Sequence, residues 1–140
     1  MPQGECMKIT GTSVQQRKKC LANLVVEHLL SLGKDAEILE NVTNSAGHRD
    51  QVLVKSCIGL IHVTATESID PNSSLTVADY KDGNQSFLAD KKFVTFGWNT
   101  KDKRTFLIFV EPKNLTNQDS LSKSQLVKLK NKEYSVAIAA

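Results

Sequence analysis

Two short segments of alternating residues most constrain what this chain can fold into. They are Gln51–Lys55 and Leu60–Thr66. Successive side chains of a strand point to opposite faces of a sheet, so each segment presents one apolar and one more polar face. A turn at Cys57–Gly59 joins the segments, and the pattern predicts a β-hairpin. On the second strand, the polar face carries His62, Thr64 and Thr66.

An amphipathic helix is predicted upstream of the hairpin, over residues 13–32. Its apolar residues recur at helical spacing, namely Val14, Leu21, Leu24, Val25, Leu29 and Leu32. Thr12 or Ser13 can cap its start, and Gly33 ends it. The first turns carry Arg17, Lys18 and Lys19, either as a solvated basic face or as contacts to a partner anion.

The rest of the chain predicts more strands and a second helix. The further strands are Ala36–Leu39, Phe93–Trp98 and Thr105–Val110, with an edge strand within Glu133–Ala139. A helix is expected from Asp119 or Ser120 to Lys130, and it carries the densest group of lysines. We interpret the aromatic residues, including Trp98, as a packed sheet, with a base-stacking platform as the alternative.

The composition favours one globular domain. The chain has 140 residues, with 40% hydrophobic and 24% charged residues. We expect a flexible arm over residues 1–11 and a single domain over residues 12–140. The net charge of +3 permits a nucleic-acid partner without requiring one.

Several kinds of location and site are disfavoured by the sequence. No apolar run reaches the roughly 18–20 residues of a membrane span, and the start lacks the pattern of a secretory signal. Cys6, Cys20 and Cys57 fit neither a zinc motif nor a disulfide framework. We therefore expect a protein of the reducing cytoplasm, with Cys20 and Cys57 as small buried residues.

The order of the predicted elements resembles that of the PD-(D/E)xK nuclease superfamily, which has the restriction-endonuclease-like fold. The resemblance covers roughly residues 12–110. The matching segments are Leu24–Gly33, Ala36–Leu39, Asp50–Val54, Ile61–Thr66 and Ala89–Phe96. It implies an α/β fold in which helices flank a central mixed β-sheet.

The resemblance also implies a set of site residues. In that family an aspartate and a second carboxylate or glutamine hold a divalent metal, and a lysine acts on the attacking water. By position, Asp50 matches the aspartate and Glu27 an accessory helix glutamate. His62 and Thr64 stand where the second carboxylate and the lysine belong. Histidine is a poor magnesium ligand and threonine has no charge, so the resemblance implies a pseudonuclease.

Each of these residues also has a structural interpretation. Glu27 can be a boundary residue of the helix, Asp50 can cap a turn or pair with Arg49, and His62 can be a hydrogen-bonded strand histidine. Alternatively, Asp50, Glu27 and His62 hold Mg²⁺ or Mn²⁺, and Lys55 supplies the missing ammonium group in a rearranged, active endonuclease site.

We therefore expect a nuclease-fold protein that binds nucleic acid, DNA rather than RNA, through an inactive or altered phosphodiesterase domain. The candidate nucleic-acid contacts are Arg17, Lys18, Lys19, Lys123, Lys128 and Lys130. One alternative is a protein-binding module on the same scaffold, such as an immunity, inhibitor or anti-defence protein. The other is an active metal-dependent endonuclease. A homodimer is compatible with the sequence.

Overall fold

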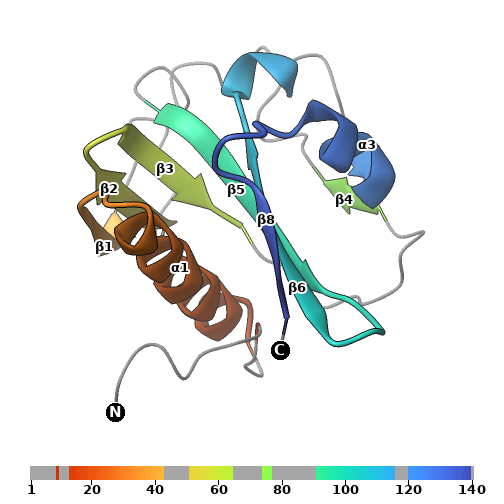
Figure 1. The fold of residues 1–140 in the computed structure, drawn as a ribbon, viewed down its shortest axis with the longest axis horizontal. Helices are drawn as coiled ribbons and strands as arrows, with labels where there is room; N and C mark the ends of the chain where they lie inside the picture. The colour runs from red at the N-terminus through yellow and green to blue at the C-terminus, as the bar shows by residue number, and fades with distance from the viewer. Residues whose placement is uncertain are drawn as a thin grey trace.

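A six-stranded mixed sheet forms the centre of the molecule (Figure 1). The computed structural model describes residue 9 and residues 13–42, 51–64, 74–76, 91–115 and 120–139. The strands of the sheet, in spatial order, are β1 (Ala36–Val42), β2 (Gln51–Ser56), β3 (Gly59–Val63), β5 (Lys91–Asn99), β6 (Arg104–Val110) and β8 (Val136–Ala139). The predicted α/β fold with a central mixed sheet is therefore confirmed.

The remaining described elements surround this sheet. The two α-helices are α1 (Val14–Ser31) and α3 (Lys123–Leu129), and a short 3-10 helix, η4, covers Pro112–Asn114. A separate two-stranded sheet pairs β4 (Ser74–Thr76) with β7 (Ser120–Ser122). No helix within the described ranges is long and apolar enough to cross a membrane.

Strands β1, β2 and β3 are antiparallel neighbours, and β3 then pairs in parallel with β5. The predicted hairpin is confirmed, with Leu53 of β2 opposite His62 of β3. Strand β3 ends at Val63, earlier than predicted. At this point both the backbone amide and the hydroxyl of Thr64 donate to the carbonyl of Thr95, at 2.9 and 3.1 Å. Thr66 lies outside the described residues.

Helix α1 begins and ends where the sequence predicts. The Ser13 hydroxyl accepts a hydrogen bond from the Gln16 amide at 3.1 Å, and the Gln16 side chain accepts one from the Ser13 amide at 3.2 Å. This reciprocal capping box satisfies two backbone donors that the helix itself cannot. Gly33 follows the helix with φ of +78°, a left-handed conformation that suits glycine.

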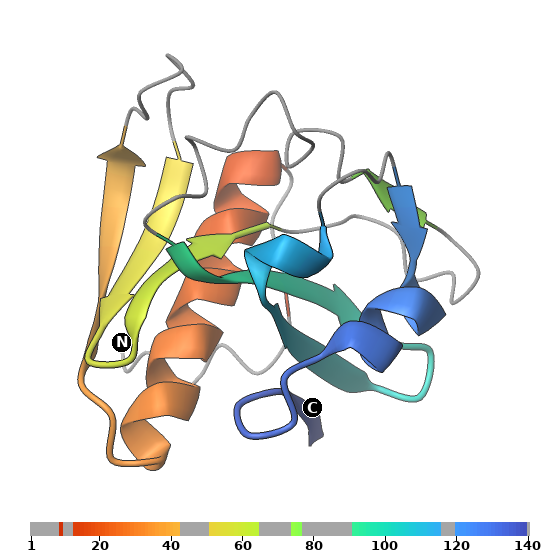
Figure 2. The same ribbon diagram turned by 90° about the horizontal axis from the view of Figure 1, so that it is seen from above.

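Apolar side chains cover both faces of the sheet. On one face, Leu21 and Val25 of α1 pack in a single cluster with Ile61 and Val63 of β3. On the other face, a second cluster joins residues of β5 and β6, such as Phe96, to Leu126 of α3. In Figure 2, β3 and β5 cross in front of α1, whereas α3 lies on the near side of the sheet. Among the described elements, α1 therefore covers one face of the central sheet and α3 the other.

Gly97 of β5 lies against the end of the Leu21 side chain of α1. A Cβ atom placed on Gly97 would lie 2.6 Å from Cδ1 of Leu21 and 3.0 Å from Cδ1 of Ile9. Both distances are too short for carbon atoms in contact. The absence of a side chain at Gly97 is therefore what lets the helix sit on the strand.

Helix α3 starts later than predicted. The prediction placed its cap at Asp119 or Ser120, but Ser120–Ser122 pairs with β4 as β7. Ser122 is the cap, because its hydroxyl accepts from the Gln125 amide and the Gln125 side chain accepts from the Ser122 amide. The capping box that begins α1 also begins α3, but at Ser122 and not at Asp119 or Ser120.

Two further expectations need correction. Ile9, from the segment predicted as a flexible arm, is only 5% exposed and exchanges two hydrogen bonds with the Asn99 side chain, at 3.0 and 2.7 Å. Cys57 is an exposed free thiol rather than a buried residue, and Cys20 is buried but disulfide-bonded. The cysteines therefore do not indicate a reducing compartment.

Candidate functional site

The structure separates two of the residues that the nuclease resemblance assigns to one metal site. Glu27 lies half-buried on α1, on the face of the sheet where Ile61 and Val63 pack. His62 lies between those two residues on β3, so its side chain points to the opposite face. Its neighbour on β5, Val94, belongs to the cluster on the α3 side. Glu27 and His62 therefore do not face each other, and Asp50 lies outside the described residues.

His62 is held as a neutral imidazole. Only 5% of the residue is exposed, and this burial is the main reason that its pKa falls from 6.5 to about 3. The positive charges of Lys18 and Lys91 lower the pKa further. A neutral histidine can bind a soft divalent metal, but a buried one beside two lysines is a poor place for a dication.

Strand pairing fixes the positions of Thr64 and Lys55. The Thr64 hydroxyl donates to the Thr95 carbonyl at 3.1 Å, which fixes it between β3 and β5. Lys55 is exposed near the hairpin turn, opposite Leu60, and on the same face as His62. It lines a hollow of about 340 Å³ together with Asp35 and Glu37.

The positions of these residues decide whether they could hold the divalent metal ion that a PD-(D/E)xK site uses. In the part of the chain that the structure describes, no three His, Cys, Asp or Glu residues lie close enough to hold a metal ion together. A magnesium site needs several oxygen ligands in near-octahedral geometry. Glu27 and His62 do not fit that requirement, because they lie on opposite faces of the sheet and one of them offers nitrogen.

The basic first turns of α1 are less exposed than predicted. Arg17 is only 7% exposed, Lys18 is half-buried and Lys19 is exposed. Arg17 stands four residues before Leu21 and seven before Leu24, so it falls on the buried stripe of the helix. Its long stem can pack there while the guanidinium finds polar partners. Arg17 is therefore not a surface contact for phosphate in this conformation.

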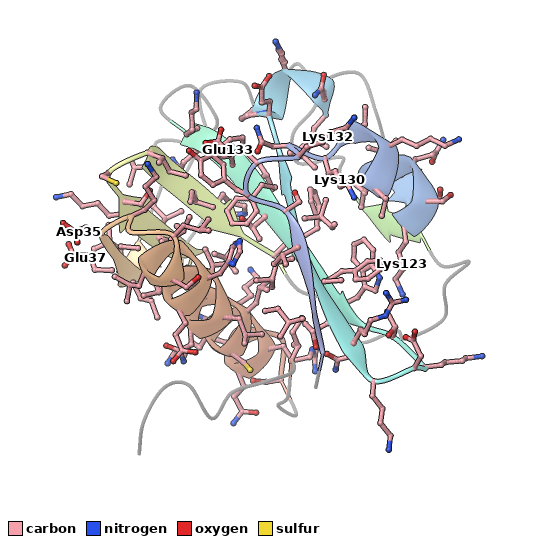
Figure 3. The ribbon with its side chains drawn as sticks, viewed as in Figure 1. Asp35, Glu37, Lys123, Lys130, Lys132 and Glu133 are labelled. Carbon is pink, nitrogen blue, oxygen red and sulfur yellow. The ribbon has the colours of Figure 1, made fainter. Side chains whose placement is uncertain are left out.

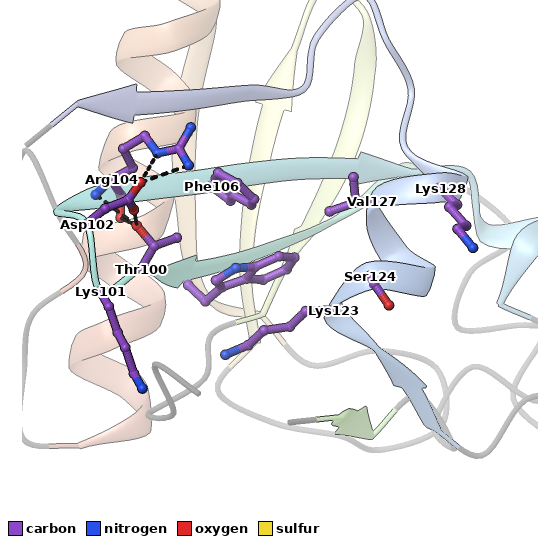
Figure 4. A pocket seen from close by; sticks show the side chains of 10 residues that line it. Thr100, Lys101, Asp102, Arg104, Phe106, Lys123, Ser124, Val127 and Lys128 are labelled. Atoms are coloured by element: carbon purple, nitrogen blue, oxygen red, sulfur yellow. Dashed lines mark hydrogen bonds and ion pairs between the residues drawn. The ribbon is translucent and has the colours of Figure 1, made fainter. Parts of the chain in front are cut away.

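Several cations line a hollow of about 630 Å³ between the β5–β6 hairpin and α3, which we call the cationic hollow. The β5–β6 hairpin contributes Lys101, Asp102 and Arg104, and α3 contributes Lys123, Ser124 and Lys128. The apolar part of its lining is Trp98, Phe106 and Val127. Figure 4 shows Lys101 and Arg104 at the hairpin end, Lys128 at the helix end and Phe106 between them.

The acidic residue in this hollow is already neutralised by the hairpin. Arg104 donates to Asp102 and forms an ion pair with it at 2.9 Å, and the Thr100 hydroxyl also donates to Asp102. The Thr100 hydrogen bond, followed by that of Arg104, lowers the pKa of Asp102. Asp102 thus holds the Arg104 guanidinium in place, while Lys101, Lys123 and Lys128 add further positive charge.

Two cations in the hollow lie over aromatic rings. The Lys123 Nζ lies 5.6 Å from the centroid of the Trp98 ring, and the Arg104 guanidinium lies 5.5 Å from that of Phe106. Both distances suit a cation–π interaction. The two rings contact each other, with centroids 5.5 Å apart. Lys123 is only 2% exposed, whereas Lys128 is exposed, so these two predicted contacts differ in access.

Lys130, which caps the end of α3, is exposed. Figure 3 labels it together with Lys132 and Glu133, and labels Asp35 and Glu37 near β1.

Sequence reasoning missed Lys101 and Arg104 as site residues. Both lie in the charged turn between two aromatic strands, and that turn was interpreted only as a hairpin connection. The sequence pattern could have indicated them, because a hairpin turn places its charged residues beside the aromatic residues of both strands. Lys123 and Lys128 were predicted as contacts, but their position beside this turn follows only from the tertiary fold. Trp98 is 3% exposed and packed, as predicted, yet it also lines the hollow.

Comparisons with protein-family models, with curated proteins and with solved structures find no match to this chain.

Proposed function

We propose that this protein binds nucleic acid through the cationic hollow and does not cleave it. The observation that carries the proposal is the placement of two exposed lysines, Lys101 of the hairpin and Lys128 of α3, on one apolar depression that Arg104 also lines. Cations grouped on one face attract a polyanion and release its counterions on binding. The same depression offers aromatic surface, which phosphate binding alone would not need.

The proposed ancestry is a decayed PD-(D/E)xK nuclease. In support, α1 precedes three antiparallel strands, and the third of them pairs in parallel with β5. The loss of cleavage is supported by the buried neutral His62 and by Thr64, whose hydroxyl is bonded to Thr95. Neither residue can supply the carboxylate or the ammonium group that the reaction uses at that position.

Binding is tested by fluorescence anisotropy with a labelled DNA oligonucleotide at several salt concentrations. We expect the logarithm of the affinity to fall linearly with the logarithm of the salt concentration, by about 0.7–0.9 per phosphate contact. Lys101→Gln and Lys128→Gln should each reduce that slope by about one contact. Lys132→Gln is the matched control, since Lys132 is an exposed lysine just beyond α3 that does not line the hollow.

Three results would overturn the proposal. No binding even at low salt would remove nucleic acid as the partner and favour the protein-binding alternative. Magnesium-dependent cleavage that Asp50→Ala abolishes would show that the site is active. Equal effects of Lys128→Gln and Lys132→Gln would place the contact elsewhere on the surface.

A further inference from the structure

We infer that the cationic hollow receives an unpaired base of single-stranded nucleic acid, with the flanking phosphates on the surrounding lysines. This inference rests on the proposed function and names its substrate class. The relevant features are the size of the hollow, the aromatic side chain in its wall and the two separate sources of its positive charge.

The size of the hollow suits a nucleotide rather than a duplex. Its volume of about 630 Å³ lies within the range of small-molecule pockets, roughly 300–1,000 Å³. A duplex presents its phosphates outward and keeps the faces of its bases stacked, so it cannot place a base in a depression of this kind. A single strand exposes those faces and can bend a base inward.

The wall of the hollow offers a surface for stacking. Phe106 is half-buried, and its ring carries the Arg104 guanidinium at 5.5 Å. Val127 of α3 supplies apolar surface to the same hollow. Stacking on an aromatic ring is tolerant of sequence, because every base has a flat π face. The site should therefore select for an unpaired base more than for a particular base.

The positive charge stands at both ends of the hollow. Lys101 comes from the hairpin turn and Lys128 from the second half of α3, and both are exposed (Figure 4). A base seated between them would have one phosphate toward each lysine. A single phosphate group, as in a free mononucleotide, would engage one end and leave the other unused. The arrangement therefore fits a strand that passes across the hollow.

The test compares a labelled 12-nucleotide single strand, the matching duplex and free AMP as a competitor. We expect tighter binding of the single strand than of the duplex at equal salt. Phe106→Ala should weaken single-strand binding by about 5- to 150-fold, the loss expected for one base–aromatic stack, and leave duplex binding unchanged. Phe106→Tyr keeps the ring and should keep the affinity. Lys128→Gln should weaken both complexes.

A second variant guards against misfolding. If Phe106→Ala loses the circular dichroism spectrum of the folded protein, Phe106→Leu, which removes the ring but keeps an apolar side chain and the same charge, should also weaken the single-strand complex alone. Equal binding of single strand and duplex, or equal losses with Phe106→Ala, would overturn the base site and leave nucleic-acid binding standing. Displacement of the strand by micromolar AMP would identify a mononucleotide site and also overturn the inference. No binding of any probe would refute the proposed function itself.

Discussion

Lowering the pH from 7 to 5 should destabilise this protein through His62. Burial, with the charges of Lys18 and Lys91, lowers the pKa of His62 in the folded protein to about 3. In the unfolded chain the pKa is that of a free histidine, about 6.5. Between these two values the unfolded state binds more protons than the folded state. Stability must therefore rise with pH in this window and be lost as the pH falls.

The size of the effect follows from proton linkage. At pH 7 about one quarter of the unfolded His62 side chains are protonated, and at pH 5 nearly all are. The folded imidazole stays neutral at both values. The free energy of unfolding should therefore fall by about 2 kcal/mol between pH 7 and pH 5 because of this one residue. The result requires only that the folded pKa lies below about 4.

Urea unfolding, followed by the fluorescence of Trp98, measures this change, since Trp98 is the single tryptophan of the chain. The matched control is His62→Gln, whose side chain stays neutral at both pH values. Carboxylates titrate alike in both proteins, so the difference between their pH dependences isolates His62. With a slope of about 1–3 kcal/mol per molar urea, the midpoint of the wild type should fall by about 1 M more than that of the variant.

An equal loss of stability in both proteins would refute this reasoning. It would mean that the folded imidazole takes up protons as readily as the unfolded one. His62 would then be accessible from solvent, and the argument against its role as a metal ligand would fail.

Two further predictions test the packing and the cysteines. Gly97→Ala would place a methyl group 2.6 Å from Cδ1 of Leu21 and should cost about 1–3 kcal/mol of stability in urea unfolding. Combined with Leu21→Ala it should cost less than the sum of the two single losses, because the new methyl group occupies part of the space that Leu21 leaves; additive losses would contradict the contact. Of the cysteines that the structure describes, Cys57 should be the one that reacts with a chromogenic disulfide reagent. Reaction that persists in Cys57→Ser would show that Cys20 is not disulfide-bonded.

The features predicted well from the sequence are those that depend on near neighbours. The capping box at Ser13 and the glycine after α1 lie within a few residues of the groups they serve. The alternation in β3 correctly placed Ile61 and Val63 on one face and His62 on the other, although it did not tell which face the helix covers. These features need no knowledge of the tertiary fold, since periodicity alone determines the faces.

The features that were missed depend on segments that meet only after folding. The hollow joins Lys101 of a hairpin to Lys128 of a helix, and no spacing in the sequence connects the two. Arg17 looked like a surface residue by type, but its helical position places it on the buried stripe. The start of α3 was misplaced because pairing with β4 takes Ser120–Ser122 into a strand. Tertiary pairing here overrides a locally plausible cap.

The parallel pairing of β3 with β5 has a consequence for how the molecule folds. Residues 64–90 separate the two strands, whereas α1 and the β1–β3 meander need only short connections. Closing the long connection costs chain entropy before any strand–strand contact offsets it. We therefore expect the N-terminal half to organise early and the docking of β5 and β6 to limit the rate. Substitutions in the β1–β2 pair and between β3 and β5 should therefore both slow refolding, because both sets of contacts form before or at the limiting step.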